Sequence, residues 1–168
     1  SEMCIRDRVY RSGYGMHVSN GILYNHESPR RGENFVTQKI VRGAASIAQE
    51  NTEFLELGNL DIERDWGYAP DYVFGMWMML QQEKGSDYIL ATGKTHKLSD
   101  FLQLSFEYFG LDHQKHIRIN PKFVRPNEPI HLCGDSSKAQ NILGWKPSVC
   151  FERMVEEMCR AAEKSNQL

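Results

Sequence analysis

Four groups of polar residues in this sequence have the types and spacing that suit a ligand with phosphate and hydroxyl groups. The stretch NHESPRRG places His26, Glu27, Arg30 and Arg31 between an apolar run and an expected helix. Arginine suits phosphate because its planar guanidinium makes two charge-assisted hydrogen bonds at once. Taken alone, the group is equally well interpreted as a solvated turn with surface ion pairs, each worth about 0–1 kcal/mol.

Two further groups contain an arginine beside an acid. Arg64, Asp65 and Trp66 precede an expected helix, and Arg125 and Glu128 belong to the segment RPNE. By itself the first group would be a surface Arg–Asp pair beside a half-buried Trp, and the second a Pro-rich turn. Together, arginines for phosphate and a carboxylate for paired hydroxyls suit a diphosphate joined to a sugar diol.

Asn20 is the fourth feature, a polar residue within the apolar run MHVSNGILY. A buried amide needs hydrogen-bond partners, so we expect a backbone neighbour or a ligand to provide them. The four features together supply no nucleophile, no metal site and no pair of carboxylates for acid/base catalysis.

Apolar periodicity places these groups in an alternation of strands and helices. We expect strands at residues 16–24, 54–59, 87–92 and 116–121, and helices at residues 34–49, from Pro70 onward, and at 98–109, 136–143 and 151–162. The fold class is therefore α/β, with the charged loops at strand ends, where ligands bind in open α/β folds. The strands are few and short and no GxGxxG turn occurs, so we interpret the chain as the second half of a larger domain.

The helix expected from Pro70 carries an apolar stripe that we assign to the core. Val73, Met76, Trp77 and Leu80 follow the spacing i, i+3, i+4, i+7 of a helix face. No cofactor is needed to explain them.

Composition and charge argue against several classes of protein. With 40% hydrophobic and 25% charged residues the chain is globular in type. A net charge of −2 argues against a nucleic-acid partner, and no apolar run approaches the ~20 residues that span a membrane. The four cysteines lack zinc spacing, so we expect reduced thiols in a cytoplasmic protein.

The first nine residues, SEMCIRDRV, have no clear period and resemble the translation of a sequencing adapter. We interpret residues 1–9 as a non-native leader that has no part in the fold.

Several segments of the chain resemble the GDP-mannose 4,6-dehydratase family of the extended short-chain dehydrogenases/reductases. These are NGILYNHESPRRGENFVTQKI, LGNLDIERDWGYAPDYVFGMWMMLQQ, YILATGKTH, RPNE and GDSSKAQNILGWKP. For residues 10–168 the resemblance implies the C-terminal part of a Rossmann-like NAD(P)-binding fold plus the substrate-binding region, without the Gly-rich N-terminal half. In the full-length enzyme it implies a homo-dimer or homo-tetramer.

The resemblance also implies a cofactor, NADP. His26 and Arg31 match positions that contact it, with Arg30 beside them, and the same loop lies at the tetramer contact in family members. A cationic loop is chemically suited to the 2′-phosphate of NADP.

The implied substrate is GDP-mannose. Asn20 and Lys39 match positions on the substrate side. Arg64, Arg125 and Glu128 match positions that hold the diphosphate and ribose of GDP.

The implied reaction is an internal redox dehydration that yields GDP-4-keto-6-deoxy-mannose. Oxidation at sugar C4 comes first, because the ketone makes the C5 proton removable before water leaves from C6. The catalytic Thr, Glu and Tyr-x-x-x-Lys of the family lie upstream of NGIL and are not found in this sequence, so we expect this chain alone to be inactive.

Two other interpretations stay open. One is a non-catalytic module that binds a sugar nucleotide or a partner subunit. The other is a sibling epimerase, reductase or dehydratase acting on a different nucleotide sugar, which the NHESPRRG loop disfavours.

Overall fold

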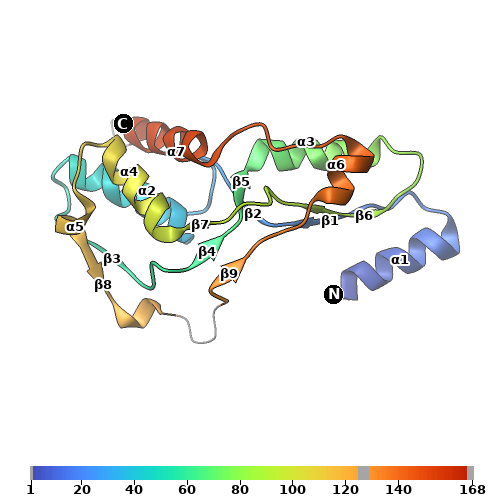
Figure 1. Cartoon of the computed structure of the whole chain (residues 1–168), viewed down its shortest axis with the longest axis horizontal. Coiled ribbons are helices and arrows are strands. Elements are labelled where there is room, and N and C mark those ends of the chain that lie inside the picture. The colour runs from blue at the N-terminus through green and yellow to red at the C-terminus, as the bar shows by residue number, and fades with distance from the viewer. Residues whose placement is uncertain (1, 125–128, 166–168) are drawn as a thin grey trace.

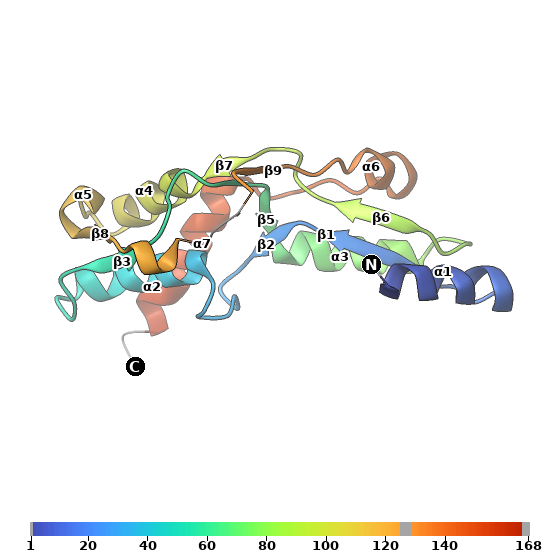
Figure 2. The same cartoon turned by 90° about the horizontal axis from the view of Figure 1, so that it is seen from below.

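The computed structural model of the chain describes residues 2–124 and 129–165. The helices are α1 (Glu2–Tyr14), α2 (Val36–Ala48), α3 (Ala69–Leu80), α4 (Leu98–Tyr108), α5 (His113–His116), the 3-10 helix η1 (Pro121–Phe123), α6 (Ser137–Leu143) and α7 (Phe151–Ser165). The strands are β1 (Asn20–Leu23), β2 (Asn25–Glu27), β3 (Leu55–Leu57), β4 (Glu63–Arg64), β5 (Trp66–Tyr68), β6 (Asp87–Leu90), β7 (His96–Lys97), β8 (Ile117–Ile119) and β9 (His131–Leu132). Figures 1 and 2 show an elongated molecule with α2, α4 and α7 at one end and α3 and α6 toward the other.

The described strands form small sheets that are mostly parallel. β1 pairs with β6, β2 with β5 and β3 with β8, all in parallel. β4 lies between β7 and β9, antiparallel to the first and parallel to the second. The α/β class predicted from the sequence is confirmed.

One predicted loop is in part a strand. Residues 25–27 of NHESPRRG form β2, whose register places His26 opposite Gly67 of β5. The prediction of a continuous loop was wrong because the pairing partner of β2 lies about 40 residues further along the chain, beyond the reach of local periodicity.

The apolar residues gather in two clusters. The larger one joins α2, α4 and α7 around residues such as Ile40, Phe101 and Met158. The smaller one joins α3, β6 and α6 around Tyr72, Leu90 and Trp145. Gly75 lets α3 approach this second cluster, because a Cβ there would lie 2.7 Å from Leu90 Cδ1 and 2.9 Å from the Trp145 ring.

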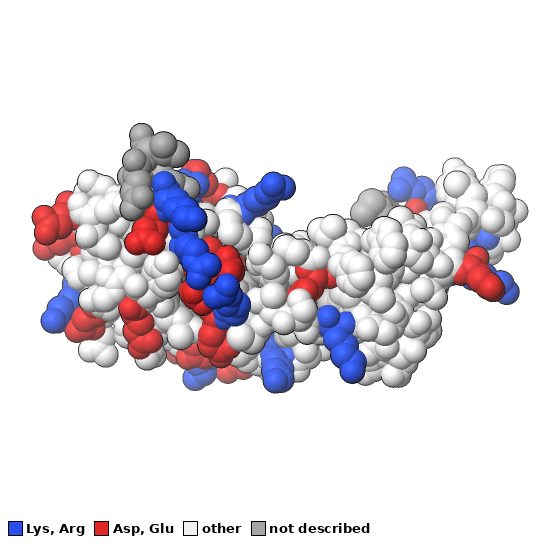
Figure 3. Space-filling model, turned by 90° about the horizontal axis from the view of Figure 1, so that it is seen from above, with Lys and Arg blue, Asp and Glu red and all other residues white. Residues whose placement is uncertain are grey.

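The apolar stripe that the sequence assigns to the core is exposed instead. Val73, Met76, Trp77 and Leu80 are 63%, 41%, 55% and 61% exposed. The helix is apolar on almost every side, so periodicity did not distinguish the face that packs. That face consists of Tyr72, Gly75 and Met79. Figure 3 shows a largely uncharged surface over this part of the molecule.

The start of the chain also differs from the sequence reading. Helix α1 begins inside the predicted leader and ends at Tyr14, and Gly15 after it takes a positive φ of 64°. Arg11 of α1 forms an ion pair with Asp87. The non-native origin of residues 1–9 stays a prediction.

The exposure of α3 gives a testable contrast between neighbours. We expect Leu80→Ser to change the free energy of unfolding by no more than about 0.5 kcal/mol, as surface substitutions usually do. Met79→Ala, which empties a side chain that is 2% exposed, should cost about 2–5 kcal/mol. Urea unfolding followed by circular dichroism measures both, and equal losses would show that the stripe is part of the core.

Candidate functional site

The connection between β2 and α2 is built around a buried carboxylate. Glu27 is 1% exposed, and the hydroxyl of Thr37 donates to its Oε2 at 2.6 Å. Arg31 Nε lies 3.2 Å from the same oxygen. Burial raises the pKa of Glu27, while the Thr37 hydroxyl and the Arg31 charge oppose that shift. Glu27 therefore fixes this loop from inside the protein.

The two arginines of the loop have different surroundings. Arg31 has its guanidinium 3.5 Å from the centre of the Phe35 ring, and its side chain is 19% exposed. Its Nε is close to Glu27 but lacks the geometry of a hydrogen bond. Arg30 is exposed. Arg31 is held in place and Arg30 faces solvent, so the first alternative, a solvated turn, does not describe Arg31.

His26 lies beside helix α3. Its Nδ1 is 2.8 Å from the carbonyl oxygen of Tyr24, and its ring stacks on Tyr72 with centroids 5.1 Å apart. Gly67, opposite His26 in the sheet, is required by the same ring, because a Cβ there would lie 2.4 Å from Tyr72. The pairing of β2 with β5 thus sets the position of His26.

Asp65 is not a surface partner of Arg64. It is fully buried, and its carboxylate accepts from Thr92 N, Thr92 Oγ1, Gly93 N and Gly134 N at 2.7–3.2 Å. The sequence reading missed this role because the donors lie 27 and more residues away. The one local indication of this role was the position of Asp65 directly after the short strand β4.

Arg64 is 7% exposed and points toward the segment before β9. One of its terminal nitrogens donates to the carbonyl oxygens of Pro129 and Ile130 at 2.8 and 3.3 Å. Arg125 and Glu128 lie outside the described residues.

Asn20 and Lys39 are placed on other elements. The Asn20 amide donates to Asp87 Oδ1 at 2.7 Å, so a side-chain carboxylate satisfies it instead of the expected backbone group or ligand. Lys39 Nζ donates to the carbonyl oxygen of Glu56 at 2.7 Å and lies 4.1 Å from the centre of the Phe123 ring. His26 lies in β2 and Arg31 in the connection that follows it. Lys39 contacts Phe123 and Arg64 contacts Pro129, which come before and after RPNE in the sequence.

Three other sequence expectations can be compared with the described residues. The four cysteines form no disulfide within this part of the chain. Across residues 2–124 and 129–165 no group of His, Cys, Asp or Glu is arranged to hold a metal ion. No helix in the same ranges has the length and apolar character needed to cross a membrane.

Comparison with known proteins identifies the family. A family model described as GDP-mannose 4,6 dehydratase matches residues 5–158. The chain belongs to the GDP-mannose 4,6 dehydratase family. GDP-mannose 4,6 dehydratase 1 of Arabidopsis thaliana is 52% identical over 149 residues, which are 89% of this chain and 41% of that protein. The chain thus spans less than half the length of this curated relative.

Solved structures show the fold. RMD from Pseudomonas aeruginosa, solved with NADPH, has a TM-score of 0.85 and 19% identity, over 98% of this chain and 52% of that one. dTDP-glucose 4,6-dehydratase from Bacillus anthracis, solved with NAD, has a TM-score of 0.81 and 18% identity, over 97% and 50%. The chain therefore has the α/β fold of the extended short-chain dehydrogenases/reductases, of which it covers about half.

Removing the charge of Asp65 should destabilise the protein strongly. In Asp65→Asn an NH₂ group would replace one of two acceptor oxygens that face N–H and O–H donors. We expect a loss of about 3 kcal/mol or more, since hydrogen bonds to a charged group contribute about 1.5–3 kcal/mol each. Chemical denaturation measures it, with Asp61→Asn on the exposed surface as the control. Equal stability of the two variants would contradict the role given to Asp65.

The buried Glu27 predicts a pH dependence. Because its pKa is raised above the ordinary 4.5, the folded chain keeps a proton that the unfolded chain releases. The stability that Glu27 contributes is therefore largest at a pH below its pKa in the unfolded chain. It falls as the pH rises through its pKa in the folded chain. Relative to Glu27→Gln, the wild type should lose stability over that window. Thr37→Val should move the loss to higher pH, because it removes the donor that opposes the shift.

Urea unfolding between about pH 4 and 8 tests this dependence, since the window lies above the reference carboxyl value of about 4.3. Thr37→Ser, which keeps the hydroxyl, is the matched control. A stability difference between wild type and Glu27→Gln that is the same at every pH would refute the prediction.

Proposed function

We propose that this chain forms the sugar-nucleotide-binding part of a GDP-mannose 4,6-dehydratase. The observation that carries the proposal is the family match over residues 5–158, which includes the whole NHESPRRG loop. The geometry supports it, because Arg31 is supported from within by Glu27 and retains an exposed edge.

GDP-mannose is the proposed substrate, with the diphosphate and ribose of GDP bound around the RPNE segment. Lys39 contacts Phe123 on one side of that segment, and Arg64 holds the carbonyl groups of Pro129 and Ile130 on the other. Lys39 beside Phe123 and Arg64 beside Pro129 are cations of the kind that suits a dianionic ligand. Arg125 and Glu128 within the segment would add a phosphate contact and a carboxylate for hydroxyl groups. Asn20 keeps its proposed place on the substrate side.

NADP is the proposed cofactor, and a bound nicotinamide would supply the redox chemistry. The residues present fit one part of it: His26 of β2 and Arg30 and Arg31 of the following connection carry donor groups, and Arg31 suits a phosphate group. The sequence contains no Gly-rich turn for the pyrophosphate, so this chain offers only part of a cofactor site.

We propose further that the chain alone does not convert GDP-mannose. No Tyr in the sequence is followed four residues later by Lys, the pair that the family uses in catalysis. A homo-dimer or homo-tetramer and a cytoplasmic location belong to the same proposal.

Thermal unfolding with added nucleotides tests the function. GDP at about a hundred times its dissociation constant should stabilise the folded chain by ~2.7 kcal/mol, and UDP or dTDP at the same concentration should not. Stabilisation by UDP or dTDP instead would favour a sibling enzyme. No shift with any nucleotide would contradict a binding site within this chain.

Two substitutions on α2 sharpen the test. Lys39→Ala should remove most of the GDP-dependent shift, since it deletes a cation beside the proposed diphosphate. Arg42→Ala removes another cation of α2, one that is paired with Glu33, and should leave the shift unchanged. If the two variants behave alike, Lys39 is not part of the site.

A further inference from the structure

A cavity of about 480 Å³ lies between the β6–β7 and α6–α7 connections. Its volume falls within the range of about 300–1,000 Å³ that small-molecule sites occupy. It shares none of the residues proposed above for cofactor or substrate. Its lining consists of Trp66, Thr92, Lys94, His96, Gln140, Lys146, Pro147, Ser148, Val149, Cys150, Phe151 and Glu152.

Both walls of the cavity are fixed by carboxylates outside it. The first wall is held by Asp65, which binds Thr92 and Gly93. The second is held by Asp71 of α3, which accepts from Ser148 N at 2.9 Å, Ser148 Oγ at 2.6 Å and Val149 N at 3.3 Å. The opening is therefore preformed, and a ligand would bind with little ordering of the loops.

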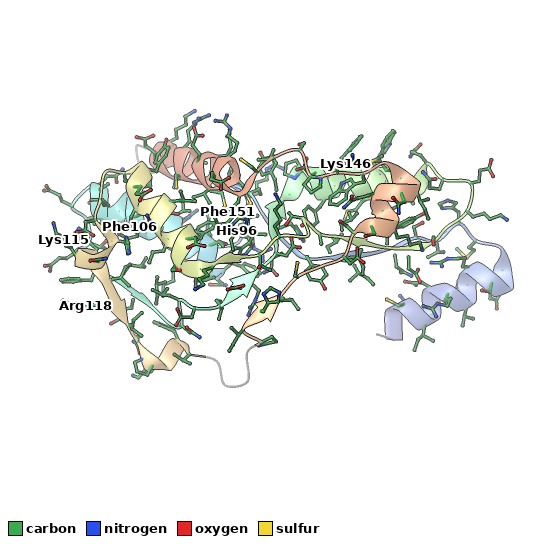
Figure 4. The ribbon with its side chains drawn as sticks, viewed as in Figure 1. His96, Phe106, Lys115, Arg118, Lys146 and Phe151 are labelled. Atoms are coloured by element: carbon green, nitrogen blue, oxygen red, sulfur yellow. The ribbon has the colours of Figure 1, made fainter. Side chains whose placement is uncertain are left out.

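The aromatic side of the cavity is rigid as well. His96 stacks on Phe151 with centroids 3.9 Å apart and the two planes within 5°. Figure 4 shows this pair at the beginning of α7, with Lys146 on the side toward α6.

The charges in the lining favour an anion. Lys94 and Lys146 come from opposite walls, and within the described residues neither has an acidic partner at ion-pair distance. Glu152 is the one acid in the lining. Its carboxylate is engaged by its own backbone N–H and by Cys150, which together with His96 and Lys94 lower its pKa. The lining thus contains two lysines and one carboxylate, which is held at the first turn of α7.

We propose that this cavity binds a phosphate group, either free or as the monoester of a small metabolite. The two lysines would contact the phosphate oxygens from both walls, since charge-assisted hydrogen bonds are the strong ones. His96 and Gln140 would lie against the remainder of an ester.

Isothermal titration calorimetry of the whole chain tests the proposal, with glycerol 3-phosphate and inorganic phosphate as the probes. We expect saturable binding at one site with a dissociation constant of about 1 mM or lower. Lys94→Ala and Lys146→Ala should each weaken binding at least about tenfold. Both lysines are exposed, so the fold should survive, which circular dichroism checks. Tighter binding of glycerol 3-phosphate assigns the site to an ester, and equal binding assigns it to free phosphate.

Lys115→Ala is the matched control. Lys115 is an exposed cation on α5, far from the cavity in Figure 4 and paired with Asp112. Three results would overturn the proposal: no saturable binding of either probe with a dissociation constant of about 1 mM or lower, unchanged binding in both cavity variants, or an equal loss in Lys115→Ala. None of them bears on the GDP test, which concerns different residues.

Discussion

The buried carboxylate of Asp65 is the constraint on which the centre of the structure depends. It accepts hydrogen bonds from two segments that are far apart in the sequence, the β6–β7 connection and the segment at Gly134. A buried charge is costly unless its hydrogen bonds are made, so these segments have to assemble together. β5, next to Asp65, belongs to the larger apolar cluster through Trp66, and β6 belongs to the smaller one. Asp65 thus ties the two clusters to each other.

Carboxylates at other loops also accept hydrogen bonds that hold neighbouring segments in place. Glu27 fixes the β2–α2 connection, Asp71 the α6–α7 connection, and Asp87 the start of β1 through Asn20. In each case the carboxylate bonds to groups within the protein. A chain with a net charge of −2 can therefore present local cationic sites, because many of its acids are engaged in the framework.

Sequence reasoning found the elements and the family loop but not the pairings between them. Helices such as α2 and α4 followed from apolar periodicity, and the φ of +69° at Gly110 and Gly144 agrees with helix ends at glycine. The roles of Asp65 and Glu27 did not follow, because partners 10 to 69 residues away are set by the tertiary fold. The predictions of the Asn20 partner and of the buried face of α3 were wrong for the same reason. Arg125 and Glu128 remain predictions.

Helix α3 and strand β1 both carry exposed apolar side chains. Parallel sheets are normally covered on both faces. Ile22 in β1 is nevertheless 47% exposed, and among the described residues β1 pairs only with β6. Phe74 and Trp77 stack on each other at the surface of the neighbouring helix. An apolar surface of this kind favours association. The Arabidopsis relative is more than twice as long as this chain. Apolar spacing along α3 therefore identifies a surface that favours burial, but packing among the described residues buries the face of Tyr72, Gly75 and Met79 instead.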